Sequence, residues 1–232
     1  GIDASRTRTS CFSGAQEVMQ LSFHGIPLIL HGDHAIEMPS EQALIVADTH
    51  FGKSATFRAH GLPVPEGDTA KDLARLDTKV ERLIIAGDFV HAAESKSKAV
   101  LELLTDWFAD LSVSVVILRG NHDRRAGALP AQWRCEWTAD YQLGDIKIVH
   151  DPIDATDGCP TLAGHLHPVV RVKHNRGRPL RLPCFWQQQS LIVLPAFGSF
   201  TGGYVIEPTS EDQVHAIVGD RVMTIPTERQ AL

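Results

Sequence analysis

The chain has 232 residues, of which 43% are hydrophobic, and its formal net charge is −6. This length is enough for one domain with a sizeable core, and no apolar run approaches the roughly 18 residues that a membrane-spanning helix needs. The negative charge excludes a protein that coats nucleic acid non-specifically, but it leaves room for a local basic strip.

Residues 1–20 show no sustained hydrophobic period, so we expect a loosely ordered leader followed by a single domain over residues 21–232. The leader lacks the apolar core of a signal peptide. The four cysteines are scattered without a Cys-x-x-Cys pair, which is typical of reduced, structural cysteines. These features predict a soluble, cytoplasmic protein with no membrane partner.

A β-hairpin is predicted from two apolar runs, 26–30 and 35–38, which flank His31-Gly32-Asp33-His34. Two histidines and an aspartate in four residues also resemble a metal site. Adjacent residues on a tight turn diverge rather than converge on one ion, so we favour a turn at Gly32-Asp33.

Three strand-turn-helix units follow. Apolar runs at 44–47, 83–86 and 113–118 predict buried strands, and each is followed by polar residues. Between them, a Gly- and Pro-rich loop leads to a helix capped by Asp68 and running through Val80, and a second helix starts near Lys96. Parallel strands of such units carry their site at the carboxyl ends.

The apolar spacing also predicts which faces of the two helices are buried. In the first helix the expected buried residues are Leu73, Leu76 and Val80, and the expected exposed ones are Lys71, Asp72, Arg75 and Lys79. In the second helix the expected buried residues are Val100, Leu104, Trp107 and Leu111.

The second half of the chain has no strong helical pattern. Short strands are predicted at 146–149, 162–163, 169–173, 181–186, 191–194, 204–207, 214–218 and 221–225. The economical fold is an α/β sandwich of two facing sheets with helices on the outer sides.

Potential metal ligands stand at the strand ends. In chain order they occur in the blocks Asp48-Thr49-His50, Gly87-Asp88-Phe89-Val90-His91, Gly120-Asn121-His122-Asp123, His150 and Gly164-His165-Leu166-His167. Oxygen and imidazole ligands without thiolate favour Mn²⁺, Fe or Zn²⁺ over an all-oxygen Ca²⁺ or Mg²⁺ site. The glycines before Asp88, Asn121 and His165 allow sharp turns there.

This ordered set of five blocks closely resembles the calcineurin-like metallophosphoesterases, which have a two-metal centre in an αββα sandwich. The resemblance implies that Asp48, His50 and His167 hold one metal and that Asn121, His150 and His165 hold the other. It also implies that Asp88 bridges the two.

The resemblance further implies hydrolysis of a phosphodiester by a metal-bridging hydroxide, because two cations about 3.5–4 Å apart lower the pKa of a shared water toward about 7. His122, next to a ligand but outside the ligand set, is the expected proton donor to the leaving oxygen. Asp123 is expected to orient His122.

Within the superfamily, the blocks containing His50 and His91 look like those of the double-strand-break repair nucleases, in which the extra histidine contacts the scissile phosphate. His91 takes that role by the resemblance; the alternative is a solvent-facing residue at the start of a loop.

More narrowly, residues 47–58, 61–65, 181–185 and 194–203 look like the ligase-associated DNA damage-response endonucleases of bacteria. This similarity implies a Mn²⁺-dependent phosphodiesterase acting on DNA in repair, encoded near a DNA ligase and a helicase.

Candidate substrate-binding cations lie near the blocks. Gly52-Lys53-Ser54 resembles the end of a nucleotide-binding P-loop, but Ala47 stands where that motif needs its first glycine, so we reject ATP binding. Lys53 and Arg58 are instead candidates for substrate phosphate, with a solvated loop as the alternative. Arg124 and Arg125 follow His122 closely and are stronger candidates.

A basic strip follows the last block. It consists of Arg171, Lys173, Arg176, Arg178 and Arg181 on an expected hairpin. The strip is placed to follow a nucleic-acid backbone; an exposed ribbon whose charges prevent edge pairing explains it equally well.

We therefore predict a dinuclear-metal phosphodiesterase, a DNA endonuclease with Mn²⁺ as its metal and DNA as its substrate. The alternatives are a small-molecule phosphodiesterase or phosphomonoesterase and, from another class, a non-catalytic interaction scaffold on the same fold.

Overall fold

The structure is a computed structural model that describes residues 18–76, 79–173 and 178–226. Most of the expected leader therefore lies outside the described residues, as does Arg176 of the basic strip. The first strand, β1 (Met19–Phe23), begins inside the stretch expected to be leader. The division into leader and single domain stays a prediction.

The first sheet contains seven strands in the order of the sequence. After β1 they are β2 (Ile26–His31), β3 (Ala35–Met38), β4 (Ala43–Val46), β5 (Arg82–Ile85), β6 (Ser114–Leu118) and β7 (Glu136–Thr138). β2 and β3 form the predicted hairpin, in which His31 pairs with Ala35. From β4 to β7 neighbouring strands are parallel, so β4, β5 and β6 end at one edge.

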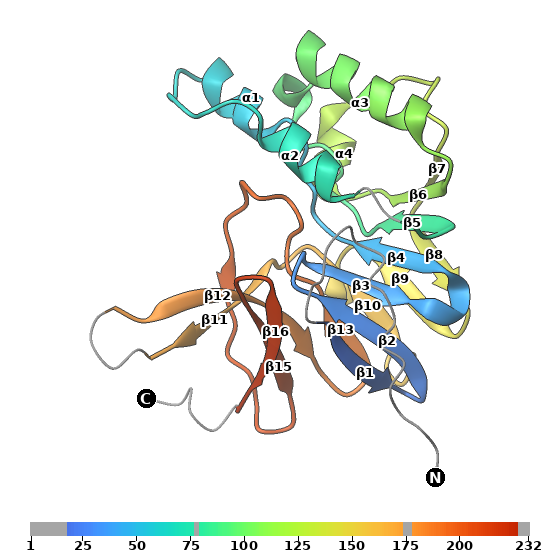
Figure 1. Cartoon of the computed structure of the whole chain (residues 1–232), viewed down its shortest axis with the longest axis vertical. Helices are drawn as coiled ribbons and strands as arrows, with labels where there is room; N and C mark the ends of the chain where they lie inside the picture. Colours follow the sequence, from blue (N-terminus) through green and yellow to red (C-terminus); the bar gives the residue numbers. More distant parts are fainter. Residues whose placement is uncertain (1–17, 77–78, 174–177, 227–232) are drawn as a thin grey trace.

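The α-helices of the described chain cover the outer face of this sheet, where Figure 1 shows them gathered above β4–β7. They are α1 (Lys53–Ala59), α2 (Asp68–Arg75), α3 (Lys98–Asp110) and α4 (Asn121–Ala126), and there are 3-10 turns at η1 (Pro39–Glu41), η2 (Ala93–Ser95) and η3 (Pro152–Asp154). None of the helices described is long and apolar enough to cross a membrane.

Two helical expectations were wrong. The segment after Gly52 forms α1, although its sequence lacks an apolar repeat, because Gly52 adopts the left-handed conformation that lets the chain turn into the helix. α2 starts after Gly67 and ends at Arg75, so Asp68 is its first residue rather than its cap. Val80 is buried as expected but lies outside the helix.

Burial also differs from the expected faces at several positions, and Leu111, expected to be buried, is only partly so. Asp72 is buried because its carboxylate accepts hydrogen bonds from the Ser199 backbone and from Arg75. In α3, Phe108 is buried with Val100 and Leu104, while Trp107 is only partly buried. Because Val100, Leu104 and Phe108 follow one another at intervals of four residues, they lie on the helix face that packs against the sheet.

The second sheet is built from the rest of the chain. Its central path runs β14-β11-β12-β13-β10-β9-β8, and β15 pairs with β12 and β16. The bounds are β8 (Asp140–Leu143), β9 (Ile146–Val149), β10 (Thr161–Ala163), β11 (Pro168–Val172), β12 (Leu180–Gln187), β13 (Leu191–Val193), β14 (Tyr204–Val205), β15 (Gln213–Val218) and β16 (Arg221–Ile225). Of these, β8 was not anticipated, and neither were β1 and β7 of the first sheet.

A buried apolar layer joins the two sheets, as predicted for a sandwich. On β4, Ile45 faces the second sheet whereas Leu44 and Val46 face the helices, so the strand is buried on both sides. Ile148 and Leu162 supply the facing surface from β9 and β10. The ends of β4–β6 are thereby held beside the ends of β9 and β10.

Arg75 connects α2 to the second half of the chain. Its guanidinium lies 4.1 Å from the centre of the Phe197 ring and donates to the Phe197 carbonyl at 2.9 Å. It also donates to the carbonyl of Asp33 in the hairpin turn. One side chain thus fixes a helix, a turn and a loop together.

His34, in the hairpin turn, donates a hydrogen bond from Nδ1 to the Ala196 carbonyl at 2.6 Å. Burial lowers its pKa to about 4. Because the unfolded chain then binds a proton more readily than the folded one, this histidine lowers stability as pH falls from about 6.5 toward about 4.

We expect His34→Asn to flatten this part of the pH profile. Asn places an amide nitrogen near the position of Nδ1 and tolerates the left-handed backbone that His34 adopts at φ 66°. Urea unfolding at pH 7 and pH 5 measures the effect: the wild-type protein should lose more stability between the two pH values than the variant. Equal losses would contradict the prediction.

Candidate metal centre

The candidate site lies where the two sheets meet, at the ends of β4, β5, β6, β9 and β10. The loops after β4 and β5 run side by side, because His50 N donates to the Asp88 carbonyl at 2.8 Å and Phe51 N to that of Phe89 at 2.9 Å. On the other sheet, Gly164 N donates to the carbonyl of His150. These backbone hydrogen bonds hold the first block beside the second and the fourth beside the fifth, and His122 N of the third block donates to Oδ1 of Asp88.

Five of the predicted ligands adopt a left-handed backbone. They are Asp48, His50, Asp88, His165 and His167, with φ between 45° and 71°. A non-glycine residue in this conformation costs of order 1–3 kcal/mol, and such residues cluster at functional sites. Here the strained backbone turns the side chains inward.

The first group of side chains is Asp48, His50 and His167, whose potential ligand atoms lie within 4.8 Å of one another. Nε2 of His50 is 3.3 Å from Nε2 of His167, which is 3.5 Å from Oδ1 of Asp48. Asp48 and His50 are buried, and His167 is partly exposed.

The second group is Asp88, His150 and His165, within the same 4.8 Å limit. Asn121 belongs with it, because Nε2 of His150 is 3.1 Å from Oδ1 of Asn121 and 3.6 Å from Oδ1 of Asp88. The two groups contain the residues that the family resemblance assigned to two different metals.

Asp88 faces both groups. Its Oδ1 points to His150 of the second group, and its Oδ2 lies 3.8 Å from Nε2 of His50 in the first. Burial raises the pKa of Asp88, and the negative charge of Asp48 raises it further, while His150 lowers it. A buried carboxylate between two imidazole groups is suited to share two cations.

The ring nitrogens and carboxylate oxygens of the site are better suited to bind a cation than to form hydrogen bonds with one another. Nδ1 of His150 donates to the Ala86 carbonyl and Nδ1 of His167 to the Gly202 carbonyl. With the proton on Nδ1, a neutral imidazole presents its lone pair at Nε2. Each lone pair faces an oxygen or another ring nitrogen, and the buried Asp48 Oδ1 has no hydrogen-bond partner among the described residues. A divalent cation would satisfy these atoms.

Burial also keeps His50 ready to bind a metal. Desolvation lowers its pKa far below the ordinary value, and the neighbouring His167 and Lys53 lower it further. A neutral imidazole is the form that ligates metals.

Three glycines leave room for the ligands. A Cβ on Gly120 would collide with Oδ1 of Asp88, one on Gly87 with the His150 ring, and one on Gly164 with Oδ2 of Asp48 at 2.8 Å. The sequence suggested that these glycines serve sharp turns. Gly87 does have a left-handed φ of 89°, but all three also allow the carboxylates and the imidazole to approach the backbone.

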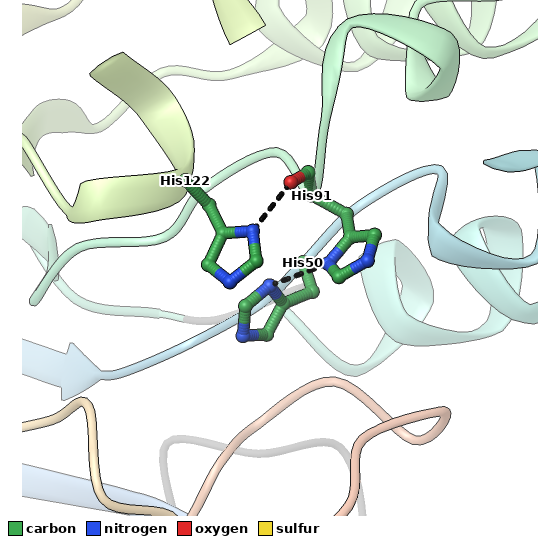
Figure 2. Close-up of side chains that lie close together, drawn as sticks. All are labelled: His50, His91 and His122. Carbon is green, nitrogen blue, oxygen red and sulfur yellow. Dashed lines mark hydrogen bonds between the residues drawn. The ribbon is translucent and has the colours of Figure 1, made fainter. Parts of the chain in front are cut away.

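His50, His91 and His122 form a cluster, as Figure 2 shows. Nδ1 of His91 lies 3.3 Å from Nδ1 of His50, and the rings of His91 and His122 are stacked with centroids 4.7 Å apart. His91 therefore lies beside the candidate ligands and is only partly exposed.

His122 is oriented by a carbonyl group and not by Asp123. Nδ1 of His122 donates to the His91 carbonyl at 2.6 Å (Figure 2). Nε2 of the same ring lies 4.0 Å from Oδ2 of Asp88. The carboxylate of Asp123 instead accepts from the backbone N–H groups of Phe89, Val90 and Gly120. The expected orienting role of Asp123 is corrected: it holds the loops after β5 and β6 in place.

Lys53 and His91 share a partly desolvated environment. Burial lowers the pKa of Lys53, while Asp88 and Asp48 raise it. Burial, Lys53 and His122 lower the pKa of His91 to about 4. Lys53, at the start of α1, thus lies within electrostatic range of both carboxylates.

The predicted arginines do not join this site. Arg58 donates to the Val64 and Pro65 carbonyls and lies 3.7 Å from Glu66, so it holds the loop after α1. Arg124 donates to the Arg119 carbonyl and lines a cavity that also contains Trp137. Arg125 is exposed on α4. A helix turns Arg124, two positions after His122, about 200° around its axis and so onto another face.

Sequence reasoning missed the groups that orient the histidines. They are the carbonyls of Ala86 and Gly202, described above, and Asp151, whose Oδ2 lies 3.6 Å from Nε2 of His165. Asp151 directly follows His150 and was detectable as a neighbouring carboxylate. The carbonyls carry no sequence signal.

Comparison with known proteins agrees with this geometry. The family model described as calcineurin-like phosphoesterase matches residues 42–207. The chain is similar to the crystal structure of Pseudomonas putida nuclease MPE, with 38% sequence identity and a TM-score of 0.77 over 90% of this chain and 100% of that chain.

A second solved structure, the protein of unknown function AQ665 from Aquifex aeolicus, is 19% identical. Its TM-score is 0.36 over 59% of this chain and 81% of that chain, which is too low to inform fold or function. No curated protein matches the sequence significantly.

Gly120→Ala tests whether the close approach of Asp88 matters. The added Cβ would displace the carboxylate, so we expect the variant to bind much less divalent metal, measured per chain by atomic emission after dialysis. Gly202→Ala is the control, because a Cβ there meets no atom within 4 Å and Gly202 has an ordinary φ. Full metal binding by Gly120→Ala would show that Asp88 can move without loss.

Proposed function

Since the chain belongs to the calcineurin-like phosphoesterase family, which makes it a metal-dependent phosphoesterase, we propose that it is a dinuclear phosphodiesterase that cleaves DNA as an endonuclease in repair. Mn²⁺ is the proposed metal, with Fe and Zn²⁺ as the other candidates for this mixed oxygen and nitrogen donor set.

The observation that carries the dinuclear proposal is the position of Asp88. One of its oxygens faces the group containing His150 and the other faces the group containing His50. We assign Asp48, His50 and His167 to one cation and Asn121, His150 and His165 to the other, with Asp88 common to both. When bound, two such cations lower the pKa of a water molecule and neutralise the charge of phosphate oxygens.

His122 is the proposed general acid. Its Nδ1–H is committed to the His91 carbonyl, so Nε2 is the atom that exchanges a proton, and it points into the site. The ring is partly exposed, which allows it to take up a proton from solvent between turnovers. A proton delivered from Nε2 to the leaving oxygen avoids expulsion of an alkoxide.

His91 and Lys53 are the proposed contacts to the scissile phosphate. Both lie beside the candidate ligands, and both sit in a partly desolvated position where an interaction with an anion is strengthened. The similarity to a nuclease supports a phosphodiester as the substrate. Association with a DNA ligase and a helicase stays a prediction from the family resemblance.

A comparison of substrates tests the proposal. Protein loaded with Mn²⁺, Zn²⁺ or Mg²⁺ should hydrolyse bis-p-nitrophenyl phosphate and cut circular single- or double-stranded DNA, which has no ends for an exonuclease. Failure with both substrates would end the nuclease proposal. Much faster cleavage of p-nitrophenyl phosphate would favour a phosphomonoesterase, and metal-independent partner binding without turnover would favour a scaffold.

Asp88→Ala should lose both metals together. A carboxylate that serves two cations has no substitute, so the expected metal content falls from two per chain toward zero and turnover falls by at least about 10³-fold. Metal analysis and bis-p-nitrophenyl phosphate hydrolysis measure the two effects. A variant that retains two metals would refute the shared role.

His122→Ala should keep both metals and lose turnover, because general-acid catalysis typically contributes about 10²–10⁴-fold. The loss should be smaller for diesters with a good leaving group such as p-nitrophenolate, which needs little protonation, than for DNA. An equal loss on both substrates would contradict the acid role.

His91→Ala should likewise retain metal, with the loss of activity expressed mainly as a higher KM if the ring binds the phosphate.

A further inference from the structure

The β11–β12 ribbon has two chemically distinct faces. The strands are antiparallel, with Val169 opposite Pro183 and Arg171 opposite Arg181. Side chains alternate along a strand, so Val169, Arg171, Arg181 and Pro183 share one face. The opposite face carries Val170, which packs with β15 in an apolar cluster.

The face bearing the arginines leads into the candidate metal centre. Val169, Arg181 and Pro183 line a cavity of about 520 Å³ that also includes His167, one of the candidate ligands. Arg181 is held there by a 2.7 Å hydrogen bond from its guanidinium to the Gly203 carbonyl. Arg171 and then Lys173 continue outward, in a step of about 6.8 Å along the strand. In Figure 1 the ribbon projects away from the sandwich.

The positive charges on the ribbon are not neutralised by described residues. Arg171, Lys173, Arg178 and Arg181 are exposed, and none forms an ion pair within the described chain. Some cations elsewhere do: Arg75 faces Asp72, Lys98 faces Glu102, and Lys147 faces Asp140.

Like charges directly opposite each other destabilise a strand pair, yet Arg171 and Arg181 occupy such positions. Protection of an exposed edge by charge does not by itself explain two like charges placed opposite each other. An uncompensated cationic cluster on a chain of net charge −6 is suited to an external polyanion.

We propose that this face of the β11–β12 ribbon, with Arg171, Lys173 and Arg181, binds the phosphate backbone of a nucleic acid and guides it through the cavity beside His167 to the metals. This inference rests on the proposed function and specifies where the substrate extends beyond the scissile phosphate. The contacts are to phosphates, so the ribbon adds affinity without reading sequence.

The test uses Arg171→Gln/Lys173→Gln, because neither side chain lies among the site residues. Arg181 is left intact, since its hydrogen bond to Gly203 adjoins the carbonyl that orients His167. Lys79→Gln is the control for loss of an exposed positive charge; Lys79 precedes β5, at the end of the strand opposite to the site.

Binding of a fluorescent oligonucleotide, measured by anisotropy in EDTA between 50 and 200 mM salt, gives the slope of log K against log salt. Each lost phosphate contact should reduce the slope by about 0.7–0.9, so wild-type affinity should fall about tenfold more over this range than that of the double variant. Hydrolysis of bis-p-nitrophenyl phosphate should be unchanged, because that diester does not reach the ribbon.

The outcomes separate the two proposals. A wild-type protein that neither binds nor cuts DNA refutes the proposed function. If the wild-type protein does both and the double variant has an unchanged salt slope, the proposed role of the ribbon is refuted while the proposed function stands. A slope change in Lys79→Gln half as large as that in the double variant would also refute it, because each lost charge would then have the same effect wherever it lies. If the wild-type protein binds vesicles containing phosphatidylserine and the double variant loses this binding without losing DNA binding, the ribbon is assigned to a lipid surface instead.

Discussion

Two buried carboxylates, Asp48 and Asp88, impose the central constraint on this structure. Each is held by backbone N–H donors, with Oδ2 of Asp48 accepting from His165 N and Oδ1 of Asp88 accepting from His122 N. Those hydrogen bonds orient the oxygens but do not compensate two negative charges in a desolvated space. A divalent cation would supply the missing positive charge, and the ring nitrogens of the surrounding histidines are of the kind that binds such a cation.

The same constraint explains the unusual backbone of the site. Left-handed turns at the ligand positions and glycines beneath them bring side chains closer than ordinary strand-to-loop geometry allows. Such strain persists only where the surroundings hold it. Here the buried layer between the sheets, the Arg75 contacts and the carboxylate of Asp123 provide that support from three directions.

The substrate side is organised by charge at increasing distance from the metals. Lys53 and His91 lie beside the carboxylates, Arg181 lines the adjoining cavity, and Arg171 and Lys173 extend along the ribbon. The innermost groups are partly buried and act at short range, whereas the outer ones are exposed and screened by salt. An acidic chain can therefore still present a cationic route to its active site.

The sequence by itself determined the sandwich fold, the five blocks and the family. Apolar runs identify strands whatever their neighbours are, and rare side chains at fixed spacing carry the chemistry. Only the tertiary structure decided that His122 is oriented by the His91 carbonyl, that Arg58 and Arg124 face away from the site, and that Asp72 is buried. These features depend on contacts between residues far apart in the chain and on backbone carbonyl groups, which every residue possesses and no sequence pattern distinguishes.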